Sequence, residues 1–260
     1  MTMAVKGEEK AGIGKLAGNR RYRPLEALRA LRILLRDKED TAQVFRIIDA
    51  LGGPAFEALY HRFRRLPHAL ALLERPRTLC DVLSDRAYLA SLPDGSLGRA
   101  YLGFVEREQL TADGLVAASD EGYGEREEVD PLMRRFGERL RDSHDLYHVV
   151  GQFGRDGMGE VCVLSFTHGV SGNPGILLVI LGGIGKFRKE LPGQPVARMA
   201  WQAWKIGRAA TFLPGADWEA LLPLPLDEVR RQLNVGTPAL YHASGLMNAG
   251  GETGPMPVAA

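Results

Sequence analysis

The stretch SHDLYHVVGQFGRDGMGE (Ser143–Glu160) predicts two helices joined by a glycine-rich loop, with a metal site between them. His144 and His148 are four residues apart, so on an α-helix their directions differ by about 40° and both project from one face. Asp145 lies about 100° from His144 around the same helix. Two imidazoles and a carboxylate within one arc are ligands that suit zinc, and also iron, cobalt or manganese.

Glu160 follows His148 after eleven residues, four of which are glycines. Such a segment can end one helix and reverse the chain into the next. We therefore expect Glu160 to begin an antiparallel helix and to supply a fourth ligand. Asp142 and His168 are expected to support the site without binding the ion. Taken alone, these residues leave open an ordinary polar helix end, in which the histidines interact with the helix dipole.

Helical periodicity dominates the rest of the chain, and strand signals are sparse. Pro24 is expected to begin the first helix, and Asp40 or Thr41 to cap the second. Gly52-Gly53-Pro54 is expected to end that helix, and a separate one should follow over 55–66. Further helices are expected over 131–150, 196–212 and 226–233. The sequence predicts an all-α, single-domain helical bundle over residues 24–245, with the HDxxH…E metal site between antiparallel helices.

Composition and charge narrow the class of protein. The 33 basic and 32 acidic residues nearly cancel, so no overall field attracts nucleic acid. Cys80 and Cys162 lie too far apart in sequence for a CxxC zinc motif, and two cysteines make no disulfide framework, which fits a reducing compartment. The longest apolar run, Ile176–Leu181, is far shorter than the roughly 20 residues that cross a bilayer. Residues 1–23 are expected to form a flexible basic arm and residues 246–260 a disordered tail.

The pattern HD-x2-H-x11-E, from His144 to Glu160, resembles the signature of the Coq4 family of ubiquinone-biosynthesis proteins. Four flanking stretches are also similar to that family, and the resemblance covers roughly residues 24–235. These stretches are DKEDTAQVFRIIDALGG (Asp37–Gly53), LPDGSLGRAYLGF (Leu92–Phe104), WQAWKIGRAATFL (Trp201–Leu213) and DWEALLPLPLDEVRRQLNV (Asp217–Val235).

The resemblance implies an enzyme, a metal-dependent carboxy-lyase or oxidative decarboxylase. Its implied substrate is a 4-hydroxy-3-methoxy-5-polyprenylbenzoate-type intermediate, which loses its C1 carboxylate or exchanges it for hydroxyl. The implied metal ligands and catalytic residues are His144, Asp145, His148 and Glu160, with zinc as the ion. The implied partners are other ubiquinone-biosynthesis proteins, a membrane surface and a second copy of the chain, and no nucleic acid. We expect a cytoplasmic location with peripheral attachment to the inner membrane.

Two alternatives remain open at the level of sequence. The chain can be a non-catalytic, prenyl-lipid-binding organiser of the biosynthetic complex, in which the metal is structural. A phosphohydrolase of the His-Asp type needs a further upstream histidine and downstream aspartate. His61, His68 and Asp217 are available for that role, but no spacing favours them.

Overall fold

The structure is a computed structural model that describes residues 22–34, 41–108 and 130–248. The described residues form α-helices, two short 3-10 helices and one isolated β-bridge, between Ser96 and Pro225, which confirms the all-α prediction. The predicted basic arm falls outside the described residues up to residue 21, and the predicted tail does so from residue 249. Leu246–Asn248, at the start of that tail, form a 3-10 helix. The domain limits stay a prediction.

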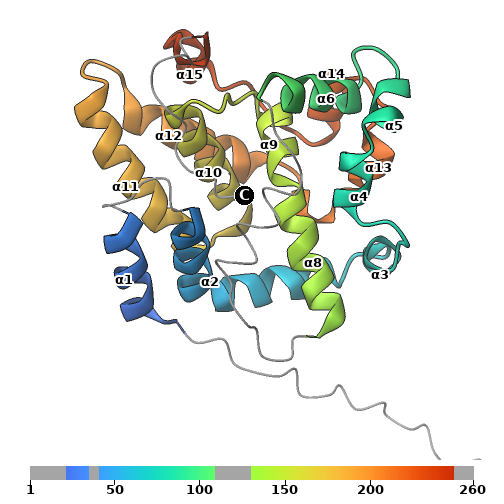
Figure 1. Cartoon of the computed structure of the whole chain (residues 1–260), viewed down its shortest axis with the longest axis horizontal. Helices are drawn as coiled ribbons and strands as arrows, with labels where there is room; N and C mark the ends of the chain where they lie inside the picture. The colour runs from blue at the N-terminus through green and yellow to red at the C-terminus, as the bar shows by residue number, and fades with distance from the viewer. Residues whose placement is uncertain (1–21, 35–40, 109–129, 249–260) are drawn as a thin grey trace, which may run out of the picture.

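The helices follow one another with short connections (Figure 1). In chain order they are α1 (Pro24–Leu34), α2 (Thr41–Phe63), α3 (Ala69–Leu73), α4 (Leu79–Ser84), α5 (Arg86–Ser91), α6 (Leu97–Arg107), α8 (Pro131–Asp142), α9 (His144–Gly151), α10 (Gly157–Ser171), α11 (Pro174–Glu190), α12 (Val196–Ala209), η1 (Leu213–Gly215), α13 (Trp218–Leu221), α14 (Leu226–Gln232), α15 (Ala239–Ala243) and η2 (Leu246–Asn248).

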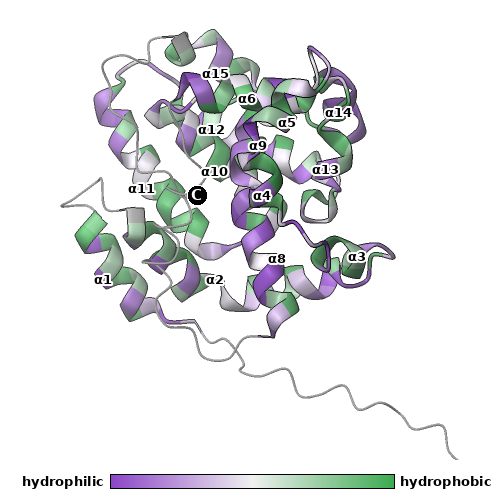
Figure 2. Ribbon diagram, turned by 45° about the vertical axis from the view of Figure 1, so that its right-hand side comes forward, coloured by the Kyte–Doolittle hydropathy of each residue, from purple (hydrophilic) through white to green (hydrophobic). Residues whose placement is uncertain are grey.

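Helix α10 lies at the centre of the bundle and packs against α9, α11 and α12 (Figure 1). Its contact with α12 is unusually close, because each helix places a glycine against the other's backbone. A Cβ atom on Gly207 would lie 2.1 Å from the carbonyl oxygen of Phe166, and one on Gly169 would lie 2.5 Å from that of Trp204. Along most helices polar and apolar residues alternate, as expected when one face is buried (Figure 2).

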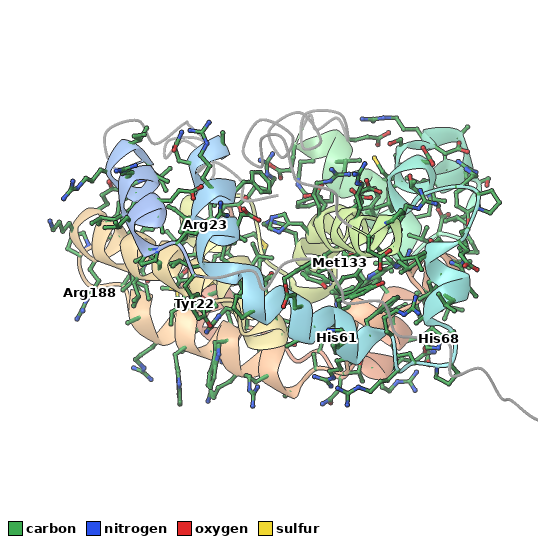
Figure 3. The ribbon with its side chains drawn as sticks, turned by 90° about the horizontal axis from the view of Figure 1, so that it is seen from below. Tyr22, Arg23, His61, His68, Met133 and Arg188 are labelled. Atoms are coloured by element: carbon green, nitrogen blue, oxygen red, sulfur yellow. The ribbon has the colours of Figure 1, made fainter. Side chains whose placement is uncertain are left out.

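A second, smaller core forms where the end of α2 meets α3 and α8. Phe63 and Phe136 are fully buried there, with ring centroids 4.7 Å apart. In Figure 3, His61 on α2 and Met133 on α8 flank this region, and His68 lies beyond the end of α2. This core fixes α8, and through α8 the start of α9.

The prediction that Gly52-Gly53-Pro54 ends a helix is wrong, because α2 runs through this segment to Phe63. Proline has no N–H to donate to the carbonyl four residues earlier, that of Ala50. The backbone N–H of Arg23 donates to the Ala50 carbonyl instead, at 2.7 Å. A partner from outside α2 thus satisfies the group that Pro54 leaves open, so the chain stays helical.

The single helix predicted over 131–150 is divided at Ser143 into α8 and α9. The Ser143 hydroxyl donates to the carbonyl of Arg139, one turn earlier, at 2.7 Å. Hydroxyl bonding of this kind bends helices. The break makes His144 the first residue of α9. The predicted cap at Asp40 or Thr41 falls on side chains outside the described residues.

The apolar run Ile176–Leu181 belongs to α11. Leu177 and Leu181 remain 41% and 57% exposed there, and Trp201 of α12 is 57% exposed. Among the described helices, none combines the length and apolar character that a membrane crossing requires.

Candidate metal centre

Two consecutive helices and the loop between them carry the site. His144 and His148 occupy the first two turns of α9, and Glu160 is the fourth residue of α10. The residue that ends α9 in the left-handed conformation is Gln152, at φ 62°, rather than one of the glycines that the sequence favoured. Asp156 then caps α10 by accepting hydrogen bonds from the amides of Met158 and Gly159. The antiparallel orientation of the two helices stays a prediction.

The loop folds back on the first turn of α10, and this contact explains the glycine at position 159 of that helix. A Cβ atom on Gly159 would lie 2.1 Å from the carbonyl oxygen of Gly154. Tyr241 of α15 links two residues of the loop. Its hydroxyl accepts a hydrogen bond from the Gly154 amide at 3.1 Å and donates one to Asp156. Glu160 is therefore held beside α9 by a turn that is closely packed and hydrogen-bonded.

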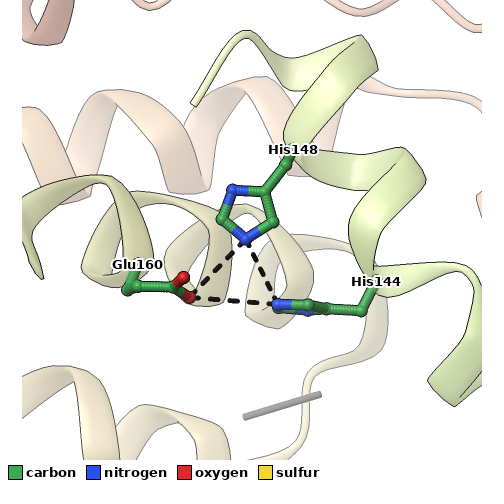
Figure 4. Close-up of side chains that lie close together, drawn as sticks. All are labelled: His144, His148 and Glu160. Atoms are coloured by element: carbon green, nitrogen blue, oxygen red, sulfur yellow. Dashed lines mark hydrogen bonds and ion pairs between the residues drawn. The ribbon is translucent and has the colours of Figure 1, made fainter. Parts of the chain in front are cut away.

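The three side chains converge on one point (Figure 4). The Nε2 atoms of His144 and His148 are 3.3 Å apart, and Oε2 of Glu160 lies 3.9 Å from the first and 3.5 Å from the second. All three residues are buried, with exposed fractions of 5%, 1% and 1% in chain order. Ligand atoms about 2.1 Å from a tetrahedral ion are separated by about 3.4 Å. The spacing in the structure is close to that value.

The ring of His148 is fixed in the orientation that a ligand needs. Its Nδ1 lies 3.2 Å from the carbonyl oxygen of Phe153, so Nδ1 carries the hydrogen and donates it. The Nε2 lone pair then faces the other two side chains. Phe104 of α6 stacks on the same ring, with centroids 5.4 Å apart. The imidazole is held on one edge and one face.

The electrostatics of the site favour binding of a cation. Burial lowers the pKa of His144 far below its usual value, and the charges of His148 and Arg155 lower it further, so this imidazole stays neutral. Burial also acts to lower the pKa of His148, but Glu160 and Asp145 outweigh it, and the pKa is raised. Neither oxygen of Glu160 makes a hydrogen bond within the described residues. A buried carboxylate without hydrogen bonds is costly unless cations compensate its charge, and Arg155 does so only from 3.5 Å.

Asp145, the remaining predicted ligand, is not part of this three-residue group. It is partly buried, and burial raises its pKa, against the opposing charges of His148 and Arg155. Its carboxylate therefore interacts electrostatically with the site, and its role as a ligand stays a prediction. Asp142 is paired with Arg141 at 2.9 Å.

The other candidate residues lie outside the group. His168 bonds through Nδ1 to the carbonyl of Asn173 at the end of α10. His68 bonds to the carbonyl of Gly215, and Asp217 accepts two hydrogen bonds from Arg75. Within residues 22–34, 41–108 and 130–248 no second cluster of three potential ligands occurs. The arrangement gives no support to the phosphohydrolase alternative.

Arg155 also faces the site, although its sequence context predicted no role for it. Its Nε lies 3.5 Å from Oε1 of Glu160, and its side chain is only 15% exposed. The sequence signal that could have pointed to Arg155 is its position in the loop, where it is a cation five residues before the predicted ligand Glu160. A charged residue in a glycine-rich loop usually points to solvent, and only the fold of this loop turns it inward.

Known proteins resemble this chain over most of its length. The family model described as coenzyme Q (ubiquinone) biosynthesis protein Coq4 matches residues 25–239. A crystal structure of a protein from Nostoc punctiforme PCC 73102 superimposes with a TM-score of 0.59 and 22% identity, covering 84% of this chain and 100% of that one. At that identity the likeness supports the fold alone.

Curated relatives include proteins of animals and fungi. The mitochondrial ubiquinone biosynthesis protein COQ4 homolog of Danio rerio is 31% identical over 205 residues, which span 77% of this chain and 72% of the relative. The mitochondrial coq-4 protein of Caenorhabditis elegans is 31% identical over 191 residues, 70% of this chain and 76% of the relative. For the COQ4 protein of Candida albicans (strain WO-1) the identity is 28%, and the match spans 55% of that relative. The chain belongs to the Coq4 family of coenzyme Q (ubiquinone) biosynthesis proteins.

Proposed function

We propose that this protein acts in ubiquinone biosynthesis as a metal-dependent decarboxylase. Its substrate is a 4-hydroxybenzoate-type intermediate that carries a polyprenyl tail, and the reaction removes the C1 carboxylate, with or without hydroxylation. Family membership supports the pathway. The single observation that supports the chemistry is the buried group of His144, His148 and Glu160, whose carboxylate has no hydrogen-bond partner among the described residues.

The donor set fits a divalent ion of the zinc class. Two imidazole nitrogens and one carboxylate oxygen are the protein ligands of several catalytic zinc sites, which keep a further position open. Asp145 is proposed either to fill that position or to accept a hydrogen bond beside it. When bound, the ion would supply a Lewis acid for the carboxylate or phenolate of the substrate. Zinc is the proposed ion, and iron, cobalt or manganese would accept the same ligands.

The chain's own residues would orient the substrate and exclude water. His148 is locked by Phe153 and Phe104, so the position of its Nε2 atom does not depend on the substrate. The exposed apolar side chains of Leu177, Leu181 and Trp201 lie on α11 and α12, which both pack against α10. They support the proposed peripheral association with a membrane, where a prenyl substrate resides. The dimer, the cytoplasmic location and the pathway partners stay predictions.

The organiser with a structural ion is the second candidate, and one observation favours it. The three ligand residues are at most 5% exposed, as in closed structural sites. The two candidates differ in what the isolated protein does with a prenylated 4-hydroxybenzoate. Stoichiometric release of CO₂ from the C1 carboxylate identifies the enzyme. Binding without turnover, together with unfolding on metal removal, identifies the organiser.

A complementation experiment tests the proposal in cells. A strain that lacks its own Coq4-family protein receives the full chain, the His148→Ala variant or, as a control, His61→Ala at an exposed position on α2. We expect His148→Ala to accumulate an intermediate that retains the carboxylate, and His61→Ala to restore ubiquinone. Normal ubiquinone synthesis by His148→Ala, at an equal protein level, contradicts the proposed function.

A further inference from the structure

Beyond the three ligands, the guanidinium of Arg155 also faces the site from a largely enclosed position. Its side chain is 15% exposed, and Nε is buried without a hydrogen bond. Its single ionic partner among the described residues is Glu160, at 3.5 Å from Nε to Oε1. An arginine carries five N–H donors. A guanidinium so enclosed and so poorly bonded is unfavourable on its own.

Glu160 does not complete the pairing. It has two oxygens, one facing Arg155 and the other facing His144 and His148. At 3.5 Å the Arg155 contact is longer than a charge-assisted hydrogen bond, which spans about 2.7–2.9 Å. An ion between the histidines and Glu160 would also compete for the negative charge that Arg155 now faces. The loaded site therefore leaves Arg155 with its charge less compensated.

The formal charges indicate what completes the site. A divalent ion and Arg155 are together three positive charges, and Glu160 and Asp145 supply two negative ones. One positive charge remains. A monoanionic carboxylate restores neutrality, and its two oxygens match the planar fork of a guanidinium.

We propose that Arg155 is the anion-binding and specificity-determining residue of this site, and that it holds the carboxylate of an aromatic acid next to the metal ion. This inference rests on the proposed function, which supplies the aromatic carboxylate as substrate class. Arg155 comes from the loop between α9 and α10, so the same turn presents both Glu160 and the cation that receives the anion. A neutral ester of the same acid lacks the charge that Arg155 recognises.

The test uses the zinc-loaded full chain and two probes, 3-geranyl-4-hydroxybenzoate and its methyl ester, titrated by calorimetry in the same detergent. The variants are Arg155→Gln, Arg155→Lys and, as a matched loss of one positive charge, Arg188→Gln at an exposed position of α11. Zinc content is measured separately by elemental analysis. We expect Arg155→Gln to keep its zinc and bind the acid about 10- to 100-fold more weakly, with ester affinity unchanged.

Each outcome decides the matter. Arg155→Lys keeps the positive charge but loses the planar fork of the guanidinium, so its affinity for the acid should be several-fold weaker than that of the wild type. If circular dichroism shows that Arg155→Gln is unfolded, the affinity of Arg155→Lys tests the proposal instead. The proposal is overturned if the deciding variant binds the acid with wild-type affinity or loses its zinc. It is also overturned if the unmodified protein binds the acid and the ester equally well. If Arg155 selects the acid while His148→Ala still makes ubiquinone, the proposed function fails and the anion site stands.

Discussion

Replacing Gly159 by alanine is expected to damage the loop that positions Glu160. The new Cβ would lie 2.1 Å from the carbonyl oxygen of Gly154, 2.7 Å from its carbon and 2.8 Å from the Tyr241 hydroxyl. Since two of these atoms are backbone, no side-chain rotation relieves the contact, and the loop must move by about 1 Å to restore a normal separation. Overpacking of this kind destabilises by about 1–3 kcal/mol, and loss of the Asp156 cap adds about 1 kcal/mol.

A matched glycine in open space gives the opposite sign. A Cβ on Gly185, inside α11, meets no atom within 4 Å, so Gly185→Ala should stabilise by about 0.5–1 kcal/mol through helix propensity. At about 2–4 °C per kcal/mol, thermal unfolding followed by circular dichroism should show Gly159→Ala lower by about 4–16 °C and Gly185→Ala higher by about 1–4 °C. The affinity for zinc should fall in Gly159→Ala and stay unchanged in Gly185→Ala. A Gly159→Ala variant that melts within 1 °C of wild type, about the smallest shift such a scan resolves, and keeps its zinc affinity, refutes this account of the turn.

Two further predictions concern the ion and the dependence on pH. Zinc at about 100 times its Kd should stabilise the metal-free chain by about 2.7 kcal/mol, which raises the melting temperature by roughly 5–11 °C. The melting temperature of Glu160→Gln should rise far less. Equal shifts for both proteins in a thermal scan would place the ion elsewhere. Arg75 lowers the pKa of Asp217 through hydrogen bonds and an ion pair, so this carboxylate stabilises the fold above its unfolded pKa of about 3.9 and ceases to do so as pH falls through the lower folded value. Asp217→Asn keeps a helix-capping side chain, so it should be less stable than wild type by about 1 kcal/mol at pH 7, since the pair is partly exposed, with the gap closing below about pH 4. Urea unfolding at both pH values checks this, with the exposed Asp227→Asn as control, and a gap that widens in acid contradicts it.

The sequence predicted the part of the site that depends on local geometry. His144 and His148 share a helix face because they are four residues apart, whichever helix carries them. The glycine-rich segment predicted the start of a second helix, and Glu160 of that helix lies beside the two histidines. Asp145 shows the limit of this geometric prediction. One step along a helix turns a side chain by about 100°, and Asp145 is not in the group formed by His144, His148 and Glu160, so its role as a ligand stays a prediction.

Other features depended on contacts between distant parts of the chain. Pro54 stays inside α2 because the amide of Arg23 reaches the carbonyl that proline leaves without a donor. At the break between α8 and α9, the Ser143 hydroxyl donates a hydrogen bond to the carbonyl of Arg139. The loop that carries Arg155 is bonded to the distant Tyr241, whose hydroxyl accepts a hydrogen bond from the Gly154 amide. Periodicity along the chain contains none of these contacts.

The bond from Arg23 to Ala50 has a practical consequence for shortened versions of the protein. Because the donor is a main-chain amide, most replacements at residue 23 preserve it, but a chain cut to begin at Pro24 loses it. Ala50 is fully buried, so its carbonyl would lose its partner where solvent does not reach, a loss of about 1–3 kcal/mol. Truncation just before α1 would thus destabilise the middle of α2. Expression libraries that trim the N-terminus should show a sharp fall in soluble yield between residues 22 and 24.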